Sequence, residues 1–385
     1  MNKRKICVVI TARPSYSRIK TALTAIKDHP NLELQIVLAG SSLLERYGDA
    51  SKIIEKDGFN VTEKIYNVIE GDSVTSMAKT TGVAIMELST VFYNLNPDMV
   101  ITIADRFETI ATSIAASYQN IPLVHIQGGE VTGNIDEKVR HANTKLADIH
   151  LVANDDARQR VIKMGEEEKT VVNTGCPSMD LAREVLNSPT LDFDPIVKYG
   201  GVGNDINWKD GYIVVMQHPV TTEFEASKRQ IKETLKAIDE LNIPTFWFWP
   251  NVDAGSDGTS SGIRQYRENN KIENIHFFKN MSPNDFLRLI KNSKCLVGNS
   301  SVGIRESAFL GVPVVNIGSR QNRRQRASSV IDCGYLKDEI KRSVRLQFKV
   351  GSYCSEFTYG DGYAGQKIAD ALVNCDLTFH KTITY

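Results

Sequence analysis

The sequence predicts an α/β protein built from two doubly wound, Rossmann-like domains with a ligand cleft between them. Short apolar runs rich in β-branched residues alternate with longer helix-like segments, which is typical of parallel α/β sheets. The alternation stops in a stretch rich in glycine and asparagine over residues 187–211 and then restarts. The length of 385 residues is too great for one compact core and suits two. Sheets of this kind bind ligands at the carboxyl ends of their strands.

The expected elements follow this alternation along the chain. In the first half, strands are expected at 5–11, 34–38, 98–103, 121–126, 149–153 and 170–174, and helices at 15–28, 73–95, 107–118 and 136–147. In the second half, strands are expected at 212–217, 244–249, 275–278, 294–298 and 313–317, and helices at 225–241, 283–292 and 303–310. The expected boundaries are a first domain over 1–185, a linker over 186–211, a second domain over 212–364, and a C-terminal helix within 365–385 that crosses back to the first domain.

The composition argues against several classes of protein. Lys plus Arg (46) balances Asp plus Glu (46), so the chain has no general positive field for nucleic acid or an anionic membrane. The apolar run at 6–10 is too short for a secretory signal, and no stretch approaches the roughly 18–20 apolar residues of a membrane span. The six cysteines are dispersed without metal-ligand spacing. We expect a cytoplasmic protein that uses no metal or other cofactor.

Candidate ligand residues in the first half follow expected strands. Arg13 comes directly after the first strand, in Thr-Ala-Arg-Pro-Ser-Tyr-Ser-Arg, where an arginine either reaches solvent or holds a phosphate with two parallel hydrogen bonds. Asp105 and Arg106 follow the strand at 98–103. Asp105 either caps the next helix or takes part in the chemistry of the site.

The stretch over residues 125–141 is the richest in polar groups. A glycine pair there lets the backbone approach a ligand, and Glu130 follows it directly. A helix is expected to begin near Asp136, so Asp136 and Arg140, four residues apart, share one helix face. Such a pair can be an ordinary exposed ion pair. A carboxylate beside two glycines at a strand end favours a functional site instead.

Three turns of the second half also follow expected strands. His218 ends the first of these strands, where it either contacts a ligand or is a satisfied loop residue. Ser300 and Ser301 open a helix, and their hydroxyls and the free N–H groups of the helix start either bind an anion or simply cap the helix. Glu306 lies in the first turn of that helix, and Arg320 follows the next strand.

Taken together, these stretches resemble the hydrolysing UDP-N-acetylglucosamine 2-epimerases, above all the epimerase domain of the bifunctional sialic-acid enzyme and its bacterial relatives. The likeness covers nearly the whole chain. It rests on co-linear stretches, among them Arg13-Pro14-Ser15-Tyr16-Ser17, Asp105-Arg106-Phe107, Gly128-Gly129-Glu130-Val131-Thr132-Gly133, Arg140-His141-Ala142, Gly175-Cys176-Pro177-Ser178, Gln217-His218-Pro219-Val220-Thr221-Thr222, Pro250-Asn251-Val252-Asp253-Ala254-Gly255-Ser256, Gly298-Asn299-Ser300-Ser301 and Tyr359-Gly360-Asp361-Gly362.

The resemblance implies a GT-B-like pair of domains with a UDP-sugar between them, in a homodimer or homotetramer. It implies distinct surroundings for each part of the ligand. The residues near the reacting sugar are Asp105, Asp136 and Gln127; those at the diphosphate are Arg13, His218, Ser300, Ser301 and Arg320; and those near the nucleoside are Asn251 and Glu306. Further substrate contacts are expected from Ser17, Arg106 and Arg140.

The chain departs from the family pattern at three positions. The sialic-acid enzymes read His-Ile-Glu-Gly-Gly-Glu where this chain has Gln127 in place of the first glutamate. Glutamine can form hydrogen bonds but cannot accept a proton. Ser15 replaces an acidic residue, and Ala104 replaces a glycine. The first two changes lie on the sugar side and bear on the choice of substrate.

The expected reaction converts UDP-N-acetylglucosamine and water to N-acetylmannosamine and UDP, for the synthesis of sialic-acid-type sugars. Elimination to a glycal, followed by addition of water, requires carboxylates on both sides of the ring. Asp105 and Asp136 are expected to transfer protons, with Glu130 in reserve, and His218 and Gln127 to assist. The alternatives are the same reaction on UDP-2,4-diacetamido-2,4,6-trideoxyglucose for legionaminic acid, a non-hydrolysing epimerase, a GT-B glycosyltransferase, and a non-catalytic UDP-sugar-binding protein.

Overall fold

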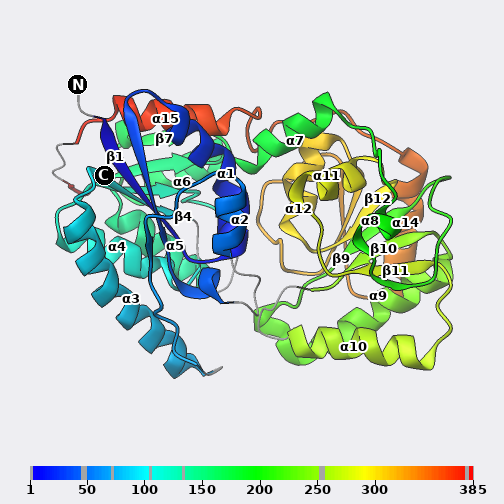
Figure 1. The fold of residues 1–385 in the computed structure, drawn as a ribbon. Coiled ribbons are helices and arrows are strands. Elements are labelled where there is room, and N and C mark those ends of the chain that lie inside the picture. Colours follow the sequence, from blue (N-terminus) through cyan, green and yellow to red (C-terminus); the bar gives the residue numbers. More distant parts are fainter. Residues whose placement is uncertain are drawn as a thin grey trace. The chain divides into compact units, whose positions relative to one another are not determined.

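The computed structural model describes residues 3–44, 50–70, 73–103, 106–131, 135–250, 256–377 and 381–384. The chain divides into two compact units (Figure 1). The first comprises Met1–Asp180 and Tyr359–Tyr385, and the second comprises Leu181–Thr358. The segment 186–211, which the sequence predicts as a linker, is part of the second unit, and residues 359–364 are part of the first.

The first unit contains a seven-stranded sheet within the described residues, in the order β3-β2-β1-β4-β5-β6-β7. All of its strand pairs are parallel. The strands are β1 (Arg4–Ile10), β2 (Leu32–Leu38), β3 (Glu63–Lys64), β4 (Met99–Ile103), β5 (Leu123–Ile126), β6 (Ile149–Val152) and β7 (Val171–Asn173). Because β1 pairs with β2 on one side and β4 on the other, the winding reverses between β1 and β4. Ligands of doubly wound sheets bind at such a switch point.

The helices of the first unit connect these strands. They are α1 (Arg13–Asp28), α2 (Ala50–Lys56), α3 (Val74–Leu95), α4 (Thr109–Tyr118), α5 (Ile135–Leu146), α6 (Asp155–Lys163) and α15 (Ala364–Asn374), with short 3-10 helices at Gly40–Leu43 and Glu168–Thr170. A further helix, α7 (Ser178–Asn187), begins at the end of this unit and continues into the second. The C-terminal α15 packs against α1 (Figure 1).

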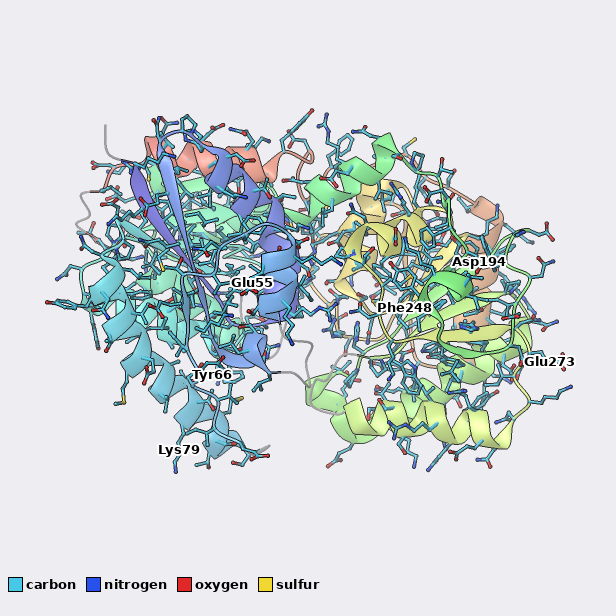
Figure 2. All side chains as sticks on the ribbon, in the orientation of Figure 1. Glu55, Tyr66, Lys79, Asp194, Phe248 and Glu273 are labelled. Atoms are coloured by element: carbon cyan, nitrogen blue, oxygen red, sulfur yellow. The ribbon has the colours of Figure 1, made fainter. Side chains whose placement is uncertain are left out.

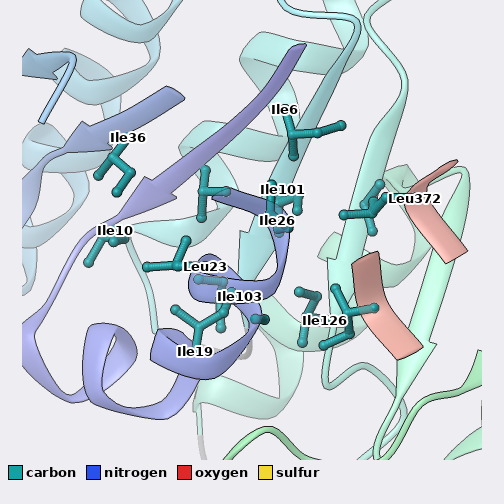
Figure 3. Close-up of a cluster of buried hydrophobic side chains, with 14 of the residues drawn as sticks. Ile6, Ile10, Ile19, Leu23, Ile26, Ile36, Ile101, Ile103, Ile126 and Leu372 are labelled. Atoms are coloured by element: carbon teal, nitrogen blue, oxygen red, sulfur yellow. The ribbon is translucent and has the colours of Figure 1, made fainter. Parts of the chain in front are cut away.

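A cluster of aliphatic side chains holds the first unit together (Figure 3). Ile19, Leu23 and Ile26 are three or four residues apart, so they form one apolar face of α1. This face packs with Ile101 of β4 and Leu372 of α15, all fully buried. Each buried side chain of this size stabilises the fold by roughly 1.5–3 kcal/mol. The packing fixes the start of α1, where Arg13 lies.

The second unit contains another seven-stranded sheet among its described residues, in the order β14-β13-β12-β9-β10-β11-β8. Its strands are β8 (Val202–Gly203), β9 (Ile213–Met216), β10 (Thr245–Phe248), β11 (Ile275–Phe278), β12 (Cys295–Gly298), β13 (Val314–Ile317) and β14 (Val330–Cys333). All pairs are parallel except that of β8 with β11. The winding reverses between β9 and β12, which makes their carboxyl ends the switch point of this sheet.

The helices of the second unit are α8 (Pro195–Tyr199), α9 (Ser227–Leu241), α10 (Ser256–Asn269), α11 (Pro283–Lys291), α12 (Ser301–Ile304), α13 (Glu306–Leu310) and α14 (Lys337–Val350), with a 3-10 segment at Thr221–Ala226. The core of the unit includes Phe248 and Trp247 of β10, and Trp247 stacks at 5.9 Å between ring centroids on Phe277. Charged side chains such as Lys79 and Glu273 are exposed on the surfaces of the two units (Figure 2).

The α/β class and the two doubly wound sheets predicted from the sequence are confirmed. The helix predicted over 303–310 is wrong in its bounds, because α12 begins at Ser301 and the chain breaks at Arg305 (φ −104°, ψ −71°) before α13. The predicted linker contains α8 and β8. Among the described helices, none combines the length and the apolar character that a membrane span would need.

Candidate functional site

The first unit brings three predicted positions to one edge of its sheet. β1, β4 and β5 are neighbours, so their carboxyl ends lie side by side. Arg13 follows β1, Arg106 follows β4, and Gln127 follows β5. Asp105 and the side chain of Asp136 lie outside the described residues. The two carboxylates expected to transfer protons therefore stay predictions.

Arg13 is the first residue of α1, and Ser17 lies one turn further along the same face. Both side chains are half-buried. Arg13 forms no ion pair with any carboxylate in the described part of the chain. A half-buried guanidinium without a carboxylate beside it keeps its five N–H donors for an anion.

Gln127 is held in a tight turn after β5. Its φ of 65° is in the left-handed region, and Gly129 follows at φ 74°. A Cβ on Gly129 would overlap the carbonyl oxygen of Ala157, so the turn needs glycine there. The buried Gln127 amide donates from Nε2 to the sulfur of Cys176 at 2.9 Å and accepts at Oε1 from Arg18 at 3.3 Å. Both ends of the amide are thereby oriented.

Arg18 is a site residue that reasoning from the sequence missed. It lies on the second turn of α1, half-buried, with its guanidinium directed to Gln127. Its position five residues after Arg13, at the start of the same helix, is the sequence signal that could have identified it. Parallel strand pairing of β1 to β4 and β4 to β5 is what brings α1 near the turn at 127.

Glu130 and Arg140 are joined through the backbone. Arg140 Nη1 donates to the carbonyl oxygen of Glu130 at 2.9 Å, and both residues are buried. This bond joins Glu130, directly after the glycine pair, to the second turn of α5. Arg106 is held in turn by Glu108, whose Oε1 accepts from its Nε at 2.9 Å. Arg140 and Arg106 therefore each have part of their donor capacity taken up within the protein.

The second unit gathers its predicted residues in the same manner. β13, β12 and β9 are neighbours in the sheet. Their carboxyl ends lead to Arg320, to Ser300 with Ser301, and to His218 respectively. The switch point between β9 and β12 thus carries His218 on one side and the serine pair on the other.

Asn299 joins these turns, and the sequence reasoning did not single it out. Its Oδ1 accepts from the His218 backbone N–H at 2.7 Å, and its Nδ2 donates to the His218 carbonyl at 2.8 Å. Its own carbonyl accepts from Arg320 Nη1 at 3.2 Å and from Gln321 Nε2 at 2.8 Å. A Cβ on the preceding Gly298 (φ 133°) would overlap the carbonyl of Met216, so only glycine allows this close approach.

The helix that follows the serine turn, Ser300 and Ser301, is shorter than the sequence predicts. α12 is four residues long, and Ser300 Oγ accepts from Val302 N at the long distance of 3.4 Å. Ser301 Oγ accepts from Arg305 Nη2 at 3.2 Å. An anion here would rely on local N–H and hydroxyl groups more than on a helix dipole, because the dipole of one turn is small.

Three buried side-chain oxygens at this edge accept no hydrogen bond within the described residues. They are Gln217 Oε1, Gln321 Oε1 and Glu306 Oε2. A buried acceptor without a donor costs about 1–3 kcal/mol, so each of these oxygens needs a reason to be there. Within the described residues, the ion pair of this Glu306 oxygen is with Arg305, whose Nε lies 3.8 Å away, beyond hydrogen-bond distance. Hydroxyl or N–H groups of a ligand would satisfy all three. Asn251 lies outside the described residues.

The imidazole of His218 is electrically neutral at pH 7. Burial, and then the nearby positive charge of Arg320, lower its pKa from 6.5 to about 3. A neutral imidazole offers one N–H donor and one acceptor. No group of three or more His, Cys, Asp and Glu suited to a metal ion occurs among the described residues.

The chain is similar to known UDP-sugar 2-epimerases in both sequence and fold. A model of the UDP-N-acetylglucosamine 2-epimerase family matches residues 24–373. A UDP-N,N'-diacetylbacillosamine 2-epimerase (hydrolyzing) of Legionella pneumophila is 32% identical over 94% of each chain. A UDP-N-acetylglucosamine 2-epimerase of Neisseria meningitidis serogroup B is 30% identical over 94% of this chain and 91% of that one. Among solved structures, the Methanocaldococcus jannaschii UDP-GlcNAc 2-epimerase in complex with UDP-GlcNAc and UDP gives a TM-score of 0.74 at 17% identity, covering 96% and 99% of the two chains.

Proposed function

Because the chain belongs to the UDP-N-acetylglucosamine 2-epimerase family, we propose that it hydrolyses a UDP-linked 2-acetamido sugar with inversion at carbon 2. The products are UDP and the free 2-epimeric sugar. The observation that carries the proposal is the arrangement around Asn299, which holds the His218 turn and Arg320 against the serine turn. These groups have the chemistry needed to hold a departing diphosphate.

UDP-N-acetylglucosamine is the first candidate substrate, with N-acetylmannosamine as product. UDP-N,N'-diacetylbacillosamine is the second, and the name of the Legionella relative favours it. The second sugar, which is UDP-2,4-diacetamido-2,4,6-trideoxyglucose, has an acetamido group in place of the hydroxyl on carbon 4. Its carbon 6 is a methyl group in place of the hydroxymethyl group of N-acetylglucosamine. The replacement of an acidic residue by Gln127, on the sugar side, is a further reason to test both.

The proposed reaction has two steps. A carboxylate removes the hydrogen on carbon 2 while the bond from carbon 1 to the phosphate oxygen breaks, which leaves UDP and a glycal with a double bond between these carbons. Water then adds at carbon 1, and an acid protonates carbon 2 on the opposite face. We assign the two proton transfers to Asp105 and Asp136, with Glu130 in reserve. Gln127 cannot take a proton, so its role is to orient the sugar by hydrogen bonds.

The leaving group is assigned to Arg13, Ser300, Ser301, Arg320 and His218. Negative charge grows on the phosphate oxygen as its bond to carbon 1 breaks, and preformed donors stabilise that charge. Removing one such donor typically lowers the rate by about 10²–10³-fold. Neutral His218 serves as an N–H donor. Glu306, with a buried oxygen that lacks a donor among the described residues, is assigned to the ribose hydroxyls.

The test is to incubate the purified protein with each UDP-sugar and to identify every product by NMR. Release of UDP together with a free 2-epimeric sugar is expected. The UDP-sugar that is turned over faster is the preferred substrate. Formation of the 2-epimeric UDP-sugar without UDP would identify a non-hydrolysing epimerase. UDP release that requires a sugar acceptor would identify a glycosyltransferase. Tight binding without turnover of either sugar would identify a binding protein.

A further inference from the structure

A buried ionic cluster in the first unit is not used by the proposed reaction. Its centre is Glu166, which is buried and accepts hydrogen bonds from Lys145 at 2.5 Å, His150 at 3.1 Å and Lys381 at 2.6 Å. Burial alone would raise the pKa of Glu166, but these three bonds outweigh it and lower the pKa to about 2. Burial lowers the pKa of His150, so its imidazole is neutral and donates from Nε2. The carboxylate is thus fully ionised and firmly held.

Lys381 connects this cluster to the end of helix α5. Besides Glu166, its ammonium donates to the carbonyl oxygens of Thr144 at 3.3 Å and of Ala147. The last carbonyls of a helix have no partner within the helix, and a lysine there both satisfies them and complements the helix dipole. A second bond, from Thr384 N to the Gly165 carbonyl at 3.1 Å, holds the same terminal segment in place.

Helix α5 in turn reaches the candidate site at two points. The Thr144 hydroxyl is 3.1 Å from His125 Nδ1, on β5 immediately before the turn that contains Gln127. One turn earlier on α5, Arg140 donates to the Glu130 carbonyl at 2.9 Å. A displacement of α5 therefore moves both ends of the 127–130 turn, and with it Asp136 at the start of the helix.

We propose that Lys381 is a positioning residue for the reaction: it joins the C-terminal segment to the end of α5 and so sets the place of that helix and of the 127–130 turn. This inference rests on the proposed function for its effect on turnover. The structural part of the inference, that the C-terminal segment holds α5 in place, does not depend on the proposed function. Misplacement of reacting groups by about 1 Å can lower a rate about 10²-fold, so a contact far from the chemistry can act on kcat.

The test compares Lys381→Met with Lys381→Arg and with Lys367→Met. The last is the matched control, because Lys367 forms an exposed ion pair with Asp361 at 2.9 Å in the same unit. Lys381→Met is expected to lower kcat at least tenfold while the Kd for UDP, none of whose assigned ligands lies on α5 or in the 127–130 turn, changes less than twofold. Lys381→Arg, which keeps charge and donors, should recover most of the loss. Lys367→Met should match the original protein.

Amide hydrogen exchange gives a readout that does not need activity. Lys381→Met should speed exchange in α5 and in the 127–130 turn and leave β9 and β12 unchanged; if this variant does not fold, Lys381→Gln replaces it. Unchanged exchange and kcat, or an equal loss of kcat and of UDP affinity, would overturn the proposal. If the original protein releases no UDP but exchange changes as expected, the proposed function fails while the role of Lys381 in holding α5 stands.

Discussion

Asn299 connects three turns of the second unit through one buried side chain and one carbonyl group. The amide pairs with both backbone groups of His218, and the carbonyl receives Arg320 and Gln321. A buried amide that is hydrogen-bonded at both its oxygen and its nitrogen fixes geometry, because loss of either partner leaves buried polar groups unsatisfied. At the scale of single residues, Asn299 holds these turns together, so the proposed diphosphate site should depend on it.

Asn299→Ala should therefore weaken UDP binding by about tenfold or more, since two hydrogen bonds worth about 0.5–1.5 kcal/mol each are lost and His218 is released. Titration calorimetry with UDP measures the change. Asn292→Ala is the control, because Asn292 donates to the Pro189 carbonyl at 2.7 Å on an exposed part of the same unit. Equal affinities in the two variants would show that Asn299 does not organise the site.

His218 predicts a dependence of stability on pH. Its pKa is about 3 in the folded protein, lowered by burial and by Arg320, against 6.5 for an ordinary histidine. Between these values the unfolded chain binds a proton that the folded chain does not, so stability falls as the pH drops from about 6.5 towards 3. Denaturation by urea at pH 7 and pH 5 should show a smaller loss for His218→Gln than for the original protein. An NMR titration midpoint near 6.5 for His218 would contradict this account.

The individual elements show what a sequence can and cannot predict. The strand expected at 275–278 is found at those residues, because a short buried run rich in apolar side chains has few other structures available. Helix α14 was not predicted, since charged residues occupy half of Lys337–Val350 and only Ile340, Ser343, Val344 and Gln347 are buried. The break at Arg305 also escaped prediction, because it accompanies a side-chain bond to Ser301.

In the candidate site, too, some residues could be identified from the sequence and others could not. Residues after strand ends, such as Arg13 and His218, could be identified because strand ends are visible in the sequence. The pairing of Asn299 with His218 could not, since it depends on β12 lying beside β9, and strand order is set by packing of the whole sheet. Arg18 was missed for the same reason: its partner is 109 positions away along the chain.

The turn between β5 and α5 makes a prediction at the scale of an element. Gly129→Ala should destabilise the first unit by about 1–3 kcal/mol, because φ is 74° and a Cβ would meet the Ala157 carbonyl. Gly82→Ala is the matched control with the opposite sign: Gly82 lies inside α3 with no neighbouring atom in the way, so alanine should stabilise by roughly 0.5–1 kcal/mol. Urea denaturation followed by circular dichroism measures both. If Gly129→Ala did not lower the free energy of unfolding, the turn would have to accommodate a Cβ, and the prediction would be wrong.

On the scale of the whole molecule, the two units have separate tasks in the proposed reaction. The first carries the carboxylates, the oriented amide of Gln127 and one group assigned to UDP, Arg13, and the second carries the other groups assigned to UDP. Because Lys plus Arg balances Asp plus Glu over the chain, a ligand site has to supply its own local charge, and the proposal assigns this task to Arg13 and Arg320. Apart from substitutions of Arg13, changes in kcat should therefore follow substitutions in the first unit, and changes in the Kd for UDP should follow substitutions in the second.

Asp105→Asn and Asp136→Asn test this separation. Each should lower kcat by about 10²–10⁴-fold, the usual contribution of general acid–base catalysis, and leave the Kd for UDP nearly unchanged. Asp98→Asn is the control, because Asp98 is an exposed aspartate of the same unit whose carboxylate, within the described residues, accepts from the Lys5 backbone N–H. A large loss of UDP affinity in either variant would place that carboxylate at the nucleotide instead.

The most direct test of the proposed chemistry is turnover in heavy water, with the sugar product analysed by NMR and mass spectrometry. Elimination followed by protonation from solvent predicts UDP and a free 2-epimeric sugar that carries one deuterium on carbon 2. A free epimer that retains its original hydrogen on carbon 2 would contradict the elimination route and the roles given to Asp105 and Asp136.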